Sequence, residues 1–176
     1  MKAPQVILIT GGSRSGKSRM ALEKISGFPR KVFLATAVPI DEEMKRRIEA
    51  HRRERGADFE TVEEKVSLAR AIREKAPSAD GILVDCLTFW LNNLLHYGAD
   101  EKKEIEDFYA VLEEKPTTLV LVTNEINMGI MPADPLSRRF IELQGRINQE
   151  AARRADEVIF MVAGIPQILK ESFIPR

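Results

Sequence analysis

The stretch VILITGGSRSGKS, residues 6–18, decides the fold expected for this chain. A short apolar run that predicts a buried strand leads into the pattern GxxxxGK[ST] from Gly11 to Ser18, and a helical pattern begins at Lys17. In that order, a strand, a glycine-rich loop and a helix form a phosphate-binding loop, because backbone N–H groups and the helix N-terminus converge on phosphate oxygens. The stretch therefore predicts binding of a nucleoside triphosphate.

The residues of this loop have separate expected roles. Lys17 is expected to reach the β and γ phosphates and to act in catalysis, while the Ser18 hydroxyl and Asp85, which closes the apolar run 82–84, are expected to hold Mg²⁺. Contacts to the nucleotide are expected along the whole loop, from Gly11, Gly12, Ser13, Arg14, Ser15, Gly16, Lys17 and Ser18. A chance glycine turn is disfavoured, because strand, helix and acidic strand end occur together.

Further apolar runs and helical patterns alternate along the rest of the chain. The runs 32–36, 82–84, 119–123 and 158–162 predict buried strands, and the patterns 17–26, 41–55, 66–76, 87–97, 101–113 and 136–155 predict helices. Alternation of this kind predicts an α/β fold similar to P-loop NTPases, with a mostly parallel, doubly wound sheet and helices on both faces.

Composition limits the class of protein. The 176 residues include 27 Lys and Arg against 27 Asp and Glu, a balance that argues against bulk binding of nucleic acid or of an anionic membrane. Hydrophobic residues at 44% suffice for one core, so we expect a single domain over 1–176. Cys86 is the only cysteine, which excludes an intramolecular disulfide. The sequence shows no apolar run long enough for a signal peptide or a membrane span, and we expect a cytoplasmic protein.

The ends of the predicted strands should meet in one crevice. Ligands of open α/β sheets bind outside the carboxyl ends of the strands, so 35–37, 85–86 and 124–125 are expected to face the phosphate loop. For Thr36 and Asn124 the alternative is that each side chain stabilises a loop.

A basic helix is predicted over 41–55, and His51 falls on the apolar face that Met44 and Ile48 define. A neutral imidazole there, beside Arg52 and Arg55, can attack the α-phosphorus of a nucleotide. The alternative is a solvated charged face with a histidine that only packs. Spacing does not choose between these hypotheses.

Five sequence blocks in this order resemble the bifunctional adenosylcobinamide kinase and adenosylcobinamide-phosphate guanylyltransferase family of cobalamin biosynthesis. The blocks are TGGSRSGKS at 10–18, ATA at 35–37 with DEEM to HRRER at 41–55, VDCLTFWLNNL at 84–94, LVTNEINMGIMP at 121–132, and GRINQ to VAGIP at 145–166. The resemblance spans nearly the whole chain.

This resemblance implies two reactions, phosphorylation of adenosylcobinamide with ATP or GTP and then transfer of GMP from GTP to adenosylcobinamide phosphate. It implies His51 as the guanylylated residue, Mg²⁺ as cofactor and a homotrimer. Beyond the phosphate loop, it implies nucleotide contacts from Ala35, Thr36, Ala37, Arg52, Arg53, Glu54, Arg55, Glu63 and Asp85, with Glu64 as the alternative to Glu63.

Two other functions remain open from the residues alone. One is a small-molecule kinase in which His51 is structural. The other is a nucleotide-dependent switch or motor whose basic helix docks a protein or a nucleic acid.

Overall fold

The computed structural model describes residues 3–39, 42, 45, 46, 49, 58–126 and 128–171. Of the helix predicted over 41–55, Glu42, Lys45, Arg46 and Glu49 are helical. The predicted site residues His51, Arg52, Arg53, Glu54 and Arg55 lie outside the described residues.

One sheet of seven strands organises the molecule, in the order β3-β2-β4-β5-β1-β6-β7. Every neighbouring pair is parallel except β6 and β7. The strands are β1 Val6–Gly11, β2 Lys31–Ala35, β3 Phe59–Glu63, β4 Gly81–Asp85, β5 Thr118–Val122, β6 Glu157–Val162 and β7 Ile165–Lys170. The predicted mostly parallel α/β sheet is therefore confirmed.

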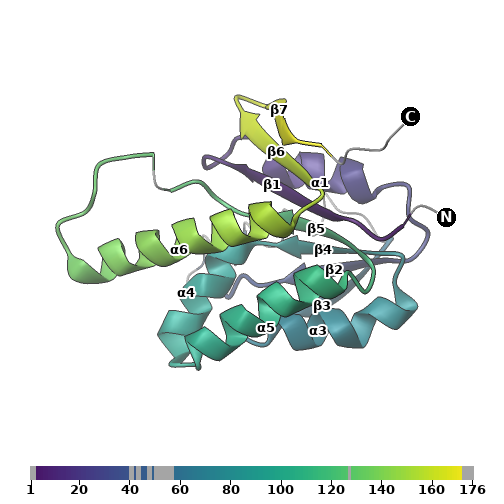
Figure 1. Ribbon diagram of the computed structural model, residues 1–176, viewed down its shortest axis with the longest axis horizontal. Helices are drawn as coiled ribbons and strands as arrows, with labels where there is room; N and C mark the ends of the chain where they lie inside the picture. Colours follow the sequence, from purple (N-terminus) through teal and green to yellow (C-terminus); the bar gives the residue numbers. More distant parts are fainter. Residues whose placement is uncertain are drawn as a thin grey trace.

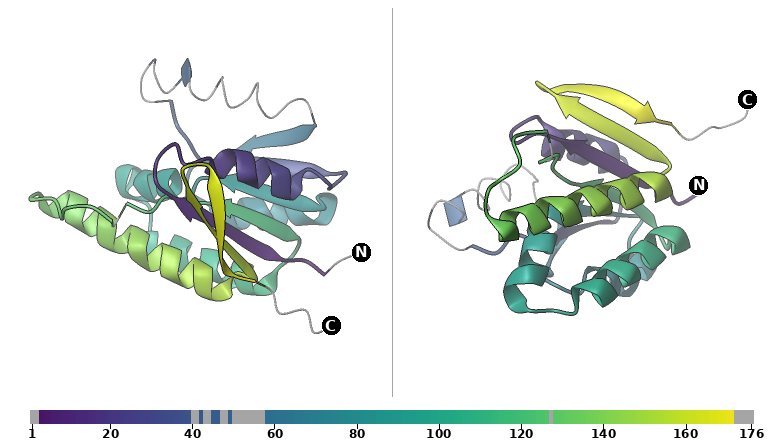
Figure 2. Two further views of the ribbon diagram at one scale, coloured as in Figure 1. Left: turned by 90° about the horizontal axis from the view of Figure 1, so that it is seen from above. Right: turned by 60° about the vertical axis from the view of Figure 1, so that its left-hand side comes forward.

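Helices cover both faces of the sheet (Figures 1 and 2). They are α1 Lys17–Ile25, α3 Leu68–Lys75, α4 Leu87–Tyr97, α5 Glu101–Glu114 and α6 Pro135–Arg154, with a 3₁₀ turn at Ala76–Ser78. Ala21 and Ile25 of α1 pack on the face that includes Ile7 and Ile9. The other four helices pack on the face that includes Leu8. This two-layer burial explains the continuous apolar runs of the inner strands.

The predicted elements that lie within the described residues are confirmed, with ends that agree or differ by one or two residues. Most of the helix predicted over 41–55 lies outside the described residues. Helix α3 begins at Leu68 instead of Val66, because Glu64 Oε1 accepts the N–H groups of Val66 and Ser67 at 2.8 and 2.9 Å and forms a turn there. Helix α6 begins one residue earlier than expected, at Pro135, with Asp134 as its N-cap.

The sequence pattern missed both edge strands. Strand β3 is only partly buried, and every residue of β7 is exposed, so neither shows the continuous apolar run of an inner strand. Strand β7 also contains Pro166, which is tolerated at a sheet edge.

Strand register brings the predicted site to one end of the sheet. Ile9 pairs with Val122, Val122 with Asp85, and Asp85 with Ala35. The segments that follow these residues therefore leave the sheet at the same level, where the phosphate loop begins.

Candidate functional site

The loop from Gly11 to Ser18 has a backbone that requires glycine at two positions. Gly11 has φ 146°, and a Cβ atom there would lie 2.5 Å from the Met161 carbonyl oxygen. Gly16 has φ 96° and is the N-cap of α1. The Gly164 N–H donates to the Ser15 carbonyl at 3.1 Å, so the turn between β6 and β7 supports the loop from behind. The loop therefore ends at the N-terminus of a helix, as the sequence predicts.

Lys17 is enclosed within the loop. Its residue is 7% exposed, and Nζ donates to the Gly12 carbonyl oxygen at 2.5 Å. Burial lowers the pKa of Lys17, an effect that the nearby Cys86 and Asp85 partly oppose. A poorly solvated ammonium gains strongly from an anion, so this position suits a phosphate.

Ser18 and Asp85 meet across the site. The Ser18 hydroxyl donates to Asp85 Oδ2 at 3.0 Å, which joins the first turn of α1 to the end of β4. A hydroxyl oxygen beside a carboxylate suits Mg²⁺, which usually takes one or two protein oxygens together with phosphates and waters. Within the described part of the chain, no three His, Cys, Asp or Glu side chains gather to hold an ion.

Ser15 adds a polar group that the protein leaves unused. Its residue is 8% exposed, and Oγ has no hydrogen-bond partner among the residues that the structure describes. A buried hydroxyl without a partner is costly, and a phosphate oxygen bound in the loop can relieve that cost.

The ends of β2 and β4 are tied together by Thr36, which is fully buried. Its hydroxyl donates to the Cys86 carbonyl and accepts from the Cys86 N–H, both at 2.8 Å. Asn93 Nδ2 in turn donates to the Thr36 carbonyl at 2.8 Å. The Thr36 side chain therefore has the loop-stabilising role, the alternative that its sequence position left open.

Asn124 is used in a similar way. Its backbone N–H and its side-chain amide both donate to the Thr88 hydroxyl at 3.1 Å. Its side chain therefore joins the end of β5 to the first turn of α4.

Glu125 is held at the same end of the sheet by a polar network that the sequence did not reveal. Oε1 accepts from the Thr10 hydroxyl at 2.9 Å and from Asn148 Nδ2 at 2.8 Å. Asn148 Oδ1 accepts from Thr123 Oγ1 at 2.8 Å and from Gln144 Nε2 at 2.9 Å. In the sequence, polar side chains fall on the buried face of a predicted helix, but this pattern does not identify their hydrogen-bond partners.

Glu63 and Glu64 have different surroundings. Glu64 is committed to the turn before α3, and its pKa is lowered: burial raises it, but the N–H groups of Val66 and Ser67 and the charge of Arg70 more than compensate. Glu63 ends the edge strand β3 and is exposed. Glu63 is therefore the more exposed of the two residues, since Glu64 is half-buried.

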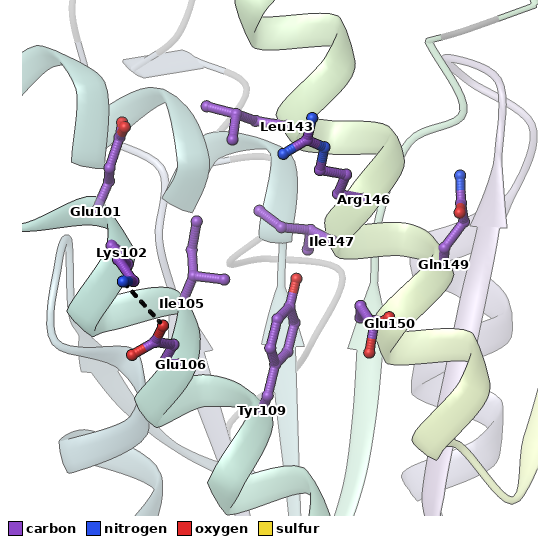
Figure 3. A pocket seen from close by; sticks show the side chains of 10 residues that line it. All are labelled: Glu101, Lys102, Ile105, Glu106, Tyr109, Leu143, Arg146, Ile147, Gln149 and Glu150. Carbon is purple, nitrogen blue, oxygen red and sulfur yellow. Dashed lines mark ion pairs between the residues drawn. The ribbon is translucent and has the colours of Figure 1, made fainter.

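A hollow of about 350 Å³ lies away from these strand ends, between α5 and α6 (Figure 3). It is lined by Ile105, Tyr109 and Leu143 together with charged groups such as Arg146 and Glu150. It includes none of the predicted site residues. The phosphate loop is therefore the candidate site.

Comparisons with known proteins show the family of this chain. Residues 7–169 match the sequence family described as cobinamide kinase / cobinamide phosphate guanyltransferase. The chain belongs to this family. The resemblance stated from the sequence is thereby confirmed, and the family's two activities are the predicted ones, both transferase reactions that consume nucleotides.

Curated relatives support membership over nearly the full length. The chain is 43% identical over 167 residues to "Bifunctional adenosylcobalamin biosynthesis protein CobP" of Pseudomonas aeruginosa, covering 93% of this chain and 96% of the relative. It is 38% identical over 175 residues to the CobU protein of that description from Escherichia coli, covering 91% and 97%. The corresponding CobU protein of Salmonella typhimurium is 39% identical over 175 residues, again covering 91% and 97%.

A solved structure shares the fold alone. A protein of Pyrococcus horikoshii superposes with a TM-score of 0.56 at 11% identity, covering 97% of this chain and 88% of that chain. Among the described helices of the present chain, none is both long and apolar enough to cross a membrane.

Proposed function

We propose that this chain phosphorylates adenosylcobinamide with ATP or GTP and then transfers GMP from GTP to adenosylcobinamide phosphate. The second reaction gives adenosylcobinamide-GDP and pyrophosphate. The observation that carries the proposal is the Ser18 to Asp85 contact of 3.0 Å beside the enclosed Lys17, in a chain of the cobinamide kinase family. Together these groups suit the triphosphate that both reactions require.

The phosphate loop serves both reactions in this proposal. Its N–H groups and Lys17 bind the triphosphate, and Ser18 and Asp85 hold Mg²⁺ through oxygen atoms. When bound, Mg²⁺ supplies neutralisation of the phosphate charge. Lys17 contributes by leaving the Gly12 carbonyl for a phosphate oxygen, which exchanges a neutral acceptor for an anionic one.

His51 is the proposed nucleophile of the second reaction. Imidazole nitrogen forms a bond to the α-phosphorus of GTP, pyrophosphate leaves, and the phosphate of adenosylcobinamide phosphate then displaces the imidazole. The phosphoramidate bond preserves the group-transfer potential of the anhydride that was broken. GMP can therefore pass from the imidazole to a second acceptor in the same crevice.

The remaining nucleotide contacts are proposed for the segments around the crevice. They are Ala35, Thr36 and Ala37 after β2, the residues Arg52, Arg53, Glu54 and Arg55, and Glu63 at the end of β3. Exposure supports Glu63 over Glu64, because the Glu64 carboxylate is already bound by the turn before α3. For Thr36 the contact must come from the backbone, since the hydroxyl is used by Cys86.

We also propose a homotrimer, as the family resemblance implies. Exposed apolar side chains supply surface for such contacts. They include Val162, Ile165, Ile168 and Leu169 on the β6–β7 hairpin. Sedimentation analysis tests this assembly, for which a mass of one chain is the contrary result.

Product analysis tests the two reactions. Adenosylcobinamide with ATP and GTP should yield first the phosphate and then adenosylcobinamide-GDP, resolved by liquid chromatography and mass spectrometry. His51→Ala should accumulate the phosphate and stop there. If the wild-type chain forms neither product, the proposed function is wrong; if it forms only the phosphate, the chain is a kinase alone.

A further inference from the structure

Glu125 lies between the two strands that carry the candidate site. Strand β5 separates β1 from β4 in the sheet, and Glu125 follows its last residue, Val122, by three positions. The Glu125 N–H donates to the Gly11 carbonyl at 3.1 Å, which ties its backbone to the first residue of the phosphate loop. This main-chain bond places the residue beside the loop.

The carboxylate of Glu125 is held in one orientation. Oε1 accepts hydrogen bonds from the Thr10 hydroxyl and from Asn148 Nδ2 at 2.9 and 2.8 Å. In the part of the chain that the structure describes, Oε2 has no hydrogen-bond partner. One oxygen thus fixes the group while the other remains able to accept a proton.

The side chains behind Glu125 form a buried network with few spare hydrogen-bonding groups. Asn148 uses its second amide hydrogen on the Asn124 carbonyl at 3.0 Å, and its oxygen accepts from Thr123 and Gln144. Thr123 and Gln144 are fully buried and Asn148 is 7% exposed. Buried polar groups cost free energy relative to apolar packing unless they are paired, so a network that orients one carboxylate suggests a functional need for that orientation.

We propose that Glu125 is the general base of the kinase step, a role that rests on the function proposed above. The hydroxyl oxygen of adenosylcobinamide forms a bond to the γ-phosphorus of the nucleotide. The bond from that phosphorus to the β,γ-bridging oxygen breaks, and the nucleoside diphosphate leaves. The hydroxyl proton passes to Glu125 Oε2.

Only one of the two reactions in this crevice needs a general base. An alcohol must lose a proton as it is phosphorylated, so the kinase step needs a base. In GMP transfer the nucleophiles are a neutral imidazole and then a phosphate monoester, which attack through an available lone pair and bring no hydroxyl proton. Removal of the base should therefore slow phosphorylation and spare guanylylation.

Glu125→Gln tests the proposal, because the amide keeps an oxygen that can accept from Thr10 and Asn148 but it cannot take up a proton. We expect kcat for phosphorylation of adenosylcobinamide to fall about 100- to 1000-fold, the range of a lost general base. KM for ATP and the rate of GMP transfer from GTP to adenosylcobinamide phosphate should stay within about twofold, because neither depends on the proton.

Two further variants control the experiment. Thr10→Val removes one of the donors that orient Oε1 and should slow only the kinase step, by about tenfold, the cost of one such hydrogen bond. Glu74→Gln on the exposed side of α3 should change neither reaction. Thermal unfolding of each variant checks that it is folded.

The contrary outcomes are distinct. If Glu125→Gln slows both reactions in parallel, the residue supports the loop or the metal and is not the base. An unchanged kinase rate also overturns the role. A wild-type chain without kinase activity overturns the proposed function and this role with it, whereas the preceding outcomes leave the proposed function standing.

Discussion

At the scale of single residues, Lys17 is a charged group that costs free energy to bury and that a bound phosphate stabilises. The ammonium is nearly buried and has the Gly12 carbonyl as its hydrogen-bond acceptor. Burial lowers the pKa of Lys17 because it disfavours the charged form. A bound triphosphate adds negative charge beside this ammonium and so favours its charged form.

Lys17→Met should therefore separate affinity from stability. We expect GTP affinity to fall about 10- to 100-fold, the range for a lost hydrogen bond to a charged group. The unfolding temperature of the nucleotide-free protein should hold or rise, because a poorly solvated charge is removed. Calorimetric titration and thermal unfolding measure the two quantities, and a clear loss of stability without a change in affinity would contradict this account.

The adjacent residues Glu63 and Glu64 form a matched pair for a second prediction. Glu64→Gln should lower the free energy of unfolding by about 1–2 kcal/mol at pH 7, because the amide is a weaker acceptor for the N–H groups of Val66 and Ser67. Glu63→Gln should weaken GTP binding, because Glu63 is the proposed nucleotide contact.

The pH dependence of this difference follows from the lowered pKa of Glu64. A carboxyl whose pKa is lower in the folded state stabilises the protein above its ordinary pKa, about 4.3, and loses that effect as the pH falls through the folded value. The difference in free energy of unfolding between wild type and Glu64→Gln should therefore be constant near neutral pH and should decrease below about pH 4.3. Urea unfolding at several pH values measures this difference. A difference that increases in acid would contradict the lowered pKa of Glu64.

At the scale of elements, the loop between β5 and α6 projects beyond the carboxyl ends of the strands (Figure 1). Met128 is 77% exposed, Ile130 100% and Met131 56%. Exposed apolar side chains beside a polar site can receive an apolar part of a substrate. We regard this loop as a candidate contact for the corrin ring.

Replacing Met128 and Met131 by Asp should weaken binding of adenosylcobinamide more than binding of GTP. Binding of each ligand can be followed separately by titration, with fluorescence or absorbance as the signal. Equal losses for both ligands would show that the loop supports the whole site and does not select the corrinoid.

Elements also show what the sequence could predict. The inner strands were predictable because a strand buried on both faces has a continuous apolar run. Helix α4 was also predicted, with the bounds Leu87–Tyr97 that the structure shows. Strands β3 and β7 carry no such run, because one is partly buried and the other fully exposed. Edge pairing depends on a neighbour's free hydrogen-bonding groups, which composition does not record.

For the site, the sequence predicted the residues of the phosphate loop, which lie in one segment of the chain, and one distant residue, Asp85. The contact of Ser18 with Asp85 joins residues 67 positions apart. The sequence predicted that both side chains lie at one metal site, from a hydroxyl after the loop lysine and an acid at a strand end, but it did not predict the direct hydrogen bond. The bonds of Thr36 to Cys86 and of Glu125 to Thr10 and Asn148 were not predictable, because register and helix rotation decide which polar groups meet.

At the scale of the whole molecule, zero net charge is compatible with the local anion site proposed above. The phosphate loop, Lys17 and the metal-binding oxygens proposed for Ser18 and Asp85 lie at one end of the sheet, and the basic residues 45–55 belong to the segment that follows β2. The site can bind a triphosphate without giving the molecule the overall positive charge of a nucleic-acid-binding protein.

The central claim, that one crevice passes GMP through His51, is tested most directly by GTP labelled at its α-phosphate. The chain contains only two histidines, so His96→Ala is a matched control for His51→Ala. We predict acid-labile, base-stable label on the wild type and on His96→Ala, and none on His51→Ala. Label that survives in His51→Ala, or its absence from the wild type under turnover conditions, would contradict the claim.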